Sequence, residues 1–133
     1  MENSIVDFIR CFIIAFAGAA AKKNLATLVR KVVKGKLYLW QIPAKYESIY
    51  YEGKDAMSAF DQAKKDNSFE FVFDGPLSDK MPAPLSNNHR TALSIYQNGP
   101  IEFYVFDQSF NWCYVVTHEG MACGPFFFVK RDE

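Results

Sequence analysis

The chain has 133 residues, of which 50% are hydrophobic and 17% are aromatic, and its 15 basic and 15 acidic side chains give a net charge of zero. This composition excludes an intrinsically disordered chain, and the length suits one domain that buries roughly two thirds of its unfolded surface. The three cysteines are an odd number without metal-ligand spacing, which argues against a disulfide framework and favours reduced thiols in the cytoplasm.

The charge is divided unevenly along the chain. Residues 1–46 carry eight basic and two acidic side chains, a net +6, whereas the remaining 87 residues carry seven basic and 13 acidic ones, a net −6. Such asymmetry indicates a basic or an acidic partner surface, unless folding interleaves these charges on an ordinary solvated exterior.

The first 35 residues predict two helices packed on a sheet. Hydrophobic side chains recur at helical spacing in Ile5–Phe16 and in Leu25–Val33, and a capping-box pattern at Ser4–Asp7 opens the first run. We expect a break at Lys22–Asn24, because one helix through residue 34 would be about 45 Å long, longer than a domain of this size is wide. Gly35 is expected to end the second helix.

The first helix contains an apolar run, Cys11–Ala21, that has to be weighed against a secretory signal and a membrane span. A span needs about 20 apolar residues. A signal peptide needs a positive amino-terminal region, whereas Glu2 and Asp7 outweigh Arg10 here. We therefore expect a buried core helix in a cytoplasmic protein, and we do not expect a membrane partner.

Between residues 36 and 90 the pattern predicts three strands, one helix and a long loop. Alternation at Lys36–Ile42 and β-favouring residues at Glu47–Tyr51 predict two short strands. Asp55 is expected to cap a helix with its apolar side chains turned inward, and Phe69–Asp74 predicts the third strand. Gly75–Asn88 contains three prolines and predicts an irregular loop.

The C-terminal third of the chain predicts four strands with short connections. Asn98-Gly99 is a strong hairpin signal, because both residues tolerate the positive φ of a type I′ turn, and it separates Thr91–Gln97 from Ile101–Asp107. Trp112–Glu119 and Phe126–Arg131 complete the set. An antiparallel four-strand meander is expected, since a parallel pairing would need a longer crossover.

Neither face of these strands is polar. In the 101–107 segment, for example, Phe103 and Val105 share one face, and Tyr104 and Phe106 share the other. Such a sheet is expected either to be covered by helices on one face and a partner on the other, or to expose an aromatic patch. The predicted fold is thus a single α+β domain with N-terminal helices, one further helix and an antiparallel sheet that ends in the meander.

The chain contains no motif that specifies a reaction. His118-Glu119 is the most prominent polar pair, but neighbouring residues of a strand point to opposite faces. Together with His89 and Arg90, this pair supports one enzymatic hypothesis, a small hydrolase or ribonuclease-like nuclease centred on His118. A metal site built from His118, Glu119, His89 and Cys123 lacks diagnostic spacing, so we expect no metal and no cofactor.

A longer pattern lies near the C-terminus, where Asp107 and Trp112 are followed by Thr117-His118-Glu119 and by Gly124-Pro125-Phe126. In these residues the chain resembles a family of small bacterial proteins of unknown function. The resemblance covers roughly Gly53–Phe128 and implies a bacterial cytosolic α+β domain without an established activity. Small domains of this type are similar in size and style to immunity proteins, which neutralise toxins by binding them. The alternative is that these residues form turns and part of the core, so that the pattern reflects the fold and not a function.

We therefore expect a non-catalytic binding protein, an immunity-type inhibitor that blocks a basic partner such as a toxin domain. Aromatic side chains supply most of the energy of such interfaces, and carboxylates steer association. The expected partner-binding residues are Tyr50, Tyr51, Tyr104, Asp107, Trp112 and Glu119. The alternatives are the hydrolase or nuclease that uses His118, Glu119 and His89, and a homodimer formed through an exposed sheet face or edge. Nucleic acid is not expected as a partner.

Overall fold

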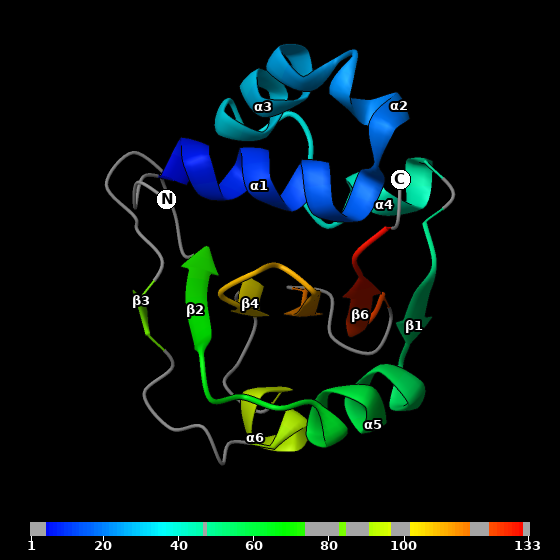
Figure 1. Ribbon diagram of the computed structural model, residues 1–133, viewed down its shortest axis with the longest axis vertical. Helices are drawn as coiled ribbons and strands as arrows, with labels where there is room; N and C mark the ends of the chain where they lie inside the picture. Colours follow the sequence, from blue (N-terminus) through cyan, green and yellow to red (C-terminus); the bar gives the residue numbers. More distant parts are fainter. Residues whose placement is uncertain are drawn as a thin grey trace.

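The computed structural model of the chain describes residues 5–46, 48–73, 83–84, 91–96, 102–117 and 123–131. In these residues a six-stranded antiparallel sheet lies between two layers of helices, as Figure 1 shows. The predicted α+β fold class is confirmed.

The first helical layer is formed by residues 5–46. It consists of α1 (Ile5–Ala17), α2 (Ala19–Lys22), α3 (Leu25–Val33) and α4 (Gln41–Lys45). The predicted break between two long helical runs is confirmed, although it begins earlier than expected, at Gly18, whose φ of +80° ends α1. In the described part of the chain, no helix has both the length and the apolar content that a membrane span requires.

The end of α3 follows the sequence closely. Gly35 has a φ of +72°, and its N–H donates to the carbonyl of Val32 at 3.0 Å. The N–H of Lys36 donates to the carbonyl of Lys31 at 2.9 Å. These two bonds form a Schellman motif, in which glycine relieves the strain of the left-handed residue.

The strand predicted at Lys36–Ile42 is wrong, because this segment forms a turn that leads into α4. Leu39 and Ile42 are both buried and lie three residues apart, which is the spacing of a helical turn, whereas in a strand they would point to opposite faces. Pro43 lies in the first turn of α4, where its missing N–H is not needed.

The sheet is assembled from strands that are far apart in the sequence. Its members are β1 (Tyr50–Glu52), β2 (Ser68–Phe73), β3 (Ala83–Pro84), β4 (Glu102–Asp107), β5 (Trp112–Val116) and β6 (Phe126–Val129). Their spatial order is β1-β6-β5-β4-β2-β3, and every pair is antiparallel. The predicted meander therefore holds for β4, β5 and β6, whereas its first expected strand is replaced by β2. The strand expected at Glu47–Tyr51 starts at Tyr50, and Glu47 lies outside the described residues.

The strand predicted at Thr91–Gln97 is wrong, because Ala92–Tyr96 forms the helix α6. Thr91 caps this helix, since its Oγ1 accepts a hydrogen bond from the N–H of Ser94 at 3.2 Å. The buried residues Ala92 and Ile95 lie three positions apart and face the sheet. The hairpin signal at Asn98-Gly99 lies outside the described residues.

The second helical layer consists of α6 and α5 (Lys54–Gln62). α5 was expected to begin with Asp55 as its cap, but Gly53, with a φ of +65°, occupies the capping position. Asp55 lies in the first turn instead, where its charge stabilises the helix dipole. Just beyond the other end, Nζ of Lys65 donates to the carbonyl of Ala63 at 3.1 Å, a contact typical of lysines that follow a helix C-terminus.

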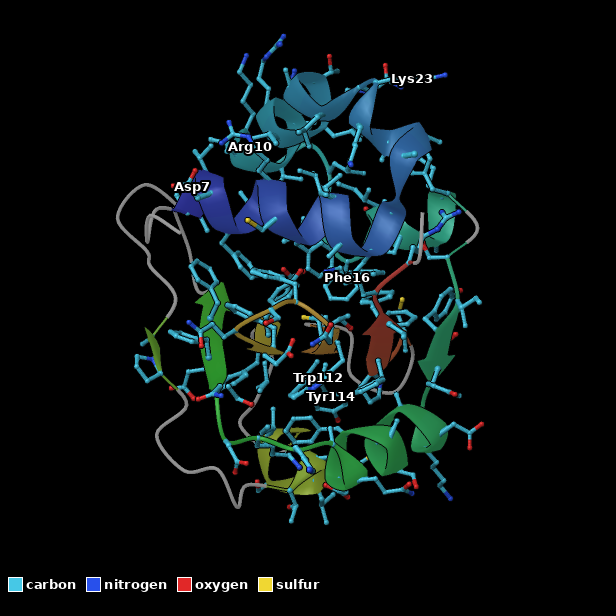
Figure 2. All side chains as sticks on the ribbon, in the orientation of Figure 1. Asp7, Arg10, Phe16, Lys23, Trp112 and Tyr114 are labelled. Carbon is cyan, nitrogen blue, oxygen red and sulfur yellow. The ribbon has the colours of Figure 1, made fainter. Side chains whose placement is uncertain are left out.

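Both faces of the sheet are covered by helices of the same chain. Phe8, Phe12 and Phe16 of α1 pack on one face, and Phe60 of α5 stacks on Tyr114 at 4.5 Å on the other. In Figure 2, Phe16 points from α1 toward the sheet, and Tyr114 points toward the second helical layer. The expectation of a partner-covered face or an exposed aromatic patch is therefore wrong for the described strands.

Candidate functional site

The residues of the enzymatic hypothesis cannot be placed. His89, His118 and Glu119 lie outside the described residues. Where the structure is described, no three His, Cys, Asp or Glu side chains are grouped so that they could hold a metal ion. The hydrolase or nuclease hypothesis therefore stays a prediction from the sequence alone.

Tyr104 is not a surface residue, and its expected role as a partner-binding anchor is wrong. Its side chain is fully buried in β4, with its ring edge-on to Phe8 and Phe12 at centroid distances of 5.9 and 5.8 Å. Burial, and to a smaller extent the neighbouring Glu102, raises the pKa of the Tyr104 hydroxyl well above its usual value. Tyr104 therefore belongs to the core, on the face of β4 that α1 covers.

Asp107 holds the turn between β4 and β5. One carboxylate oxygen accepts the N–H of Asn111 at 2.5 Å, and the other accepts Nδ2 of Asn111 at 2.9 Å. Between them, Phe110 adopts a φ of +55° and its side chain is buried. Asp107 thus serves the turn, which is the structural role that the sequence offered as the alternative to binding.

The remaining aromatic candidates differ in exposure. Trp112 is half-buried and stacks on Phe127 at 5.6 Å, and Tyr50 is half-buried against Phe126 and Phe128. Tyr51, on the edge strand β1, is 48% exposed. Of the predicted partner-binding residues that the structure describes, Tyr51 is therefore the one with a widely accessible side chain.

Some carboxylates of the described residues accept hydrogen bonds within the fold, and others are exposed. Glu102 is buried and accepts a hydrogen bond from Nε1 of Trp40 at 2.8 Å, and Asp61 accepts the N–H of Ala92 at 2.7 Å. Asp7 pairs with Arg10 at 3.2 Å on α1. The acidic binding surface expected from the sequence therefore stays a prediction, since Glu52, Asp55 and Asp66 are exposed.

The basic residues, by contrast, face solvent together. The buried residues of α3 are Leu28, Val29 and Val32, which lie on one side of the helix. The opposite side of this amphipathic helix therefore faces solvent. Figure 2 shows Lys23 pointing away from the molecule at the outer edge of this layer. The exposed cations of α2, α3 and the following turn, which we term the basic face, are Lys22, Lys23, Arg30, Lys31, Lys34 and Lys36.

The basic face is neither neutralised nor purely polar. None of its six cations forms an ion pair with another residue of the described ranges. Val33 and Tyr38 are 44% and 46% exposed beside it, and the Tyr38 ring is held by stacking on Trp40 at 5.7 Å. The uneven charge of the sequence was the signal for this surface, and the burial of the opposite side of α3 shows that Arg30, Lys31 and Lys34 face solvent.

A cavity of about 300 Å³ lies where the end of α1, α2, the β4–β5 turn and the segment after β6 meet. Arg131 closes one wall, because its N–H donates to the carbonyl of Ala15 at 2.9 Å and its Nη1 donates to the carbonyls of Ala17 and Tyr46 at 3.0 and 2.8 Å. Gly18, which ends α1, lines another wall. Sequence reasoning missed this cavity, since its lining comes from three distant segments.

The cavity combines an apolar floor with positive charge. Cys11, Ala15 and Phe110 contribute apolar surface, and Lys22 and Lys130 join Arg131 as cations; among the described residues of the lining, none is acidic. Burial, followed by the nearby Asp7, raises the pKa of the Cys11 thiol, so the thiol is neutral near neutral pH. Lys22 belongs to both the cavity and the basic face.

A family model described as "Domain of unknown function (DUF4275)" matches residues 14–127. The match begins within α1, so it includes most of the N-terminal helical layer, for which the sequence resemblance offered no counterpart. No curated protein and no solved structure matches the chain.

Proposed function

Since the chain belongs to the DUF4275 family, whose description assigns no activity, we propose its function from its surface: a non-catalytic binding protein for an acidic protein partner. The observation that carries this proposal is the basic face, six exposed cations without ion-pair partners among the described residues. Like charges gathered on one surface attract an oppositely charged partner and accelerate its association.

The composition of the basic face favours a protein over a nucleic acid. Val33 and Tyr38 are exposed beside the cations, and a rigid aromatic ring among charges is typical of protein interfaces. Tyr38 is fixed by Trp40, so little side-chain entropy is lost when a partner packs on it. A surface for single-stranded nucleic acid would need several such rings along the basic track.

An immunity-type inhibitor is one form of this proposal, with one change in the expected partner. The sequence led us to expect a basic toxin domain, but Glu102 is buried against Trp40 and Asp107 holds the β4–β5 turn, whereas the six cations of the basic face are exposed. The proposed partner surface is therefore acidic. We place the protein in the cytoplasm, and its three cysteines, none of which forms a disulfide, suit that compartment.

The test is affinity capture from the lysate of the native organism with matched charge-reversal variants. In the first variant Arg30, Lys31 and Lys34 are all changed to Glu, and in the control the exposed Lys45, Lys54 and Lys64 are all changed to Glu. We expect wild type and control to retain the same acidic protein, and the α3 variant to bind it about tenfold or more weakly. Circular dichroism of each variant shows that the fold is kept.

Two further results would decide against the proposal. Retention of the partner by the α3 variant at wild-type strength would remove the basic face from binding. Loss of the captured material after nuclease treatment would show that nucleic acid is what the face binds.

A protein complex should also weaken between about 0.1 M and about 1 M salt, because the Debye length falls from about 10 to about 3 Å.

A further inference from the structure

We propose that the cavity between α1, α2, the β4–β5 turn and the segment after β6 is a binding site for a carboxylate joined to an apolar group. This inference goes beyond the proposed function and does not depend on it, since a small ligand can be tested without any partner protein.

The charge of the ligand follows from the lining of the cavity. Lys22 and Lys130 are exposed side chains at its rim, and the third cation, Arg131, is held in place by the carbonyls of Ala17 and Tyr46. The lining residues that the structure describes include no acidic side chain. A partly enclosed site to which three cationic side chains contribute favours an anion.

The apolar part of the ligand follows from the floor. Ala15 and Phe110 are buried residues that show apolar surface to the cavity, and the Cys11 thiol beside them is kept neutral by its raised pKa. A bare inorganic anion would leave this floor in contact with water, whereas an aromatic or aliphatic group would cover it. A volume of about 300 Å³ suits a ligand the size of one large side chain.

The geometry of the site is built into the backbone. Gly18 ends α1 with a φ of +80°, and the N–H of Ala21 then donates to the carbonyl of Gly18 at 3.2 Å as α2 begins. This corner brings Lys22 toward the segment after β6, which is tied to α1 by the Arg131 backbone. The cavity is therefore a property of the folded chain before any ligand arrives.

The experiment titrates the isotope-labelled full chain with 3-phenylpropionate and follows the amide signals of Gly18, Ala19 and Ser109, which line the cavity. The matched neutral probe is 3-phenylpropanamide, which has the same apolar body without the charge. We expect saturable shifts at these amides with a Kd in the millimolar range, as for other small fragments, and binding of the amide about tenfold weaker.

Variants locate the binding. Ala19 is exposed and lines the cavity, so Ala19→Trp should fill it and abolish the shifts, whereas Ser58→Trp on the opposite helical layer should leave them unchanged. The exposed pair Lys22→Gln and Lys130→Gln removes charge without touching the core, and it should weaken 3-phenylpropionate about tenfold. This second variant keeps the test valid if the tryptophan variant does not fold.

The proposal is overturned if the cavity amides show no saturable shift, if the amide probe binds as well as the acid, or if the double glutamine variant binds like wild type. A short peptide that ends in phenylalanine with a free carboxylate then distinguishes the source of the ligand. Clearly tighter binding of this peptide assigns the site to a chain end of another protein, and equal binding assigns it to a free acid. Either result supports a carboxylate site.

Discussion

The guanidinium of Arg131 donates to the carbonyl of Ala17 at 3.0 Å and so joins two residues that lie 114 positions apart in the sequence. The same Nη1 donates to the carbonyl of Tyr46 at 2.8 Å. Arg131 thereby connects the segment after β6 to the last residue of α1 and to the residue after α4. A cation at this place also opposes the negative end of the α1 dipole.

Replacing Arg131 should destabilise the fold more than replacing its neighbour. Arg131→Ala removes charged hydrogen bonds to two carbonyls, and we expect it to lower the free energy of unfolding by about 2–3 kcal/mol. Lys130→Ala is the control, since Lys130 is exposed, and it should cost less than about 0.5 kcal/mol. Urea unfolding followed by circular dichroism measures both, and equal midpoints would contradict the role given to Arg131.

The buried contact between Trp40 and Glu102 should show strong energetic coupling. Nε1 of Trp40 donates to Oε1 of Glu102 at 2.8 Å, with both side chains buried. Trp40→Phe leaves a buried carboxylate without this donor, so we expect a loss of about 2–4 kcal/mol. A double-mutant cycle with Glu102→Ala, which removes the acceptor, should give a coupling of about 1 kcal/mol or more, and strict additivity would show that the bond contributes little.

Asp61 should stabilise the start of α6. Its carboxylate accepts the N–H of Ala92 at 2.7 Å, which satisfies one of the free donors at the helix N-terminus. We expect Asp61→Ala to cost about 1 kcal/mol and to speed hydrogen exchange at Ala92 and Ile95. Asp66→Ala, at an exposed position, is the control, and faster exchange in that variant as well would argue against a local effect.

Tyr104 should make the fold sensitive to alkaline pH. Its pKa is raised by burial in the folded state, while the unfolded chain titrates near the ordinary value of 10.0. The unfolded state therefore loses its proton first, and the stabilising contribution is complete below pH 10 and decreases as the pH rises above it. Unfolding free energies between pH 8 and 11, at about unit steps, should fall less steeply in Tyr104→Phe than in wild type. Parallel curves would contradict this assignment.

Local sequence patterns correctly predicted those elements whose conformation depends mainly on their own residues. The apolar spacing in α1 and α3 predicts helices, and Gly35 ends α3 because only glycine takes a left-handed φ at little cost. The alternation in β4 and β5 likewise predicts which residues share a face, and both faces are buried as it indicates. In these cases the spacing of apolar side chains along the segment is enough to predict the element and its buried face.

Short apolar runs could not be assigned in this way. Thr91–Gln97 and Lys36–Ile42 contain residue types that are common in strands, but their buried residues lie three positions apart, which is the spacing of a helical turn. The helix that begins after Thr91 is stabilised by Asp61, which lies 31 residues before Ala92 and accepts a hydrogen bond from its N–H. A partner so distant is not visible in a local pattern.

Composition and spacing by themselves determined the α+β class, the two long N-terminal helices and the charge of the N-terminal third. Only the tertiary structure decided that Tyr104 is buried, that α1 and α5 cover opposite faces of the sheet, and that a cationic cavity forms beside Arg131. The reason is physical: propensity and periodicity act over a few residues, whereas burial and cavities arise from contacts between segments that meet only after folding.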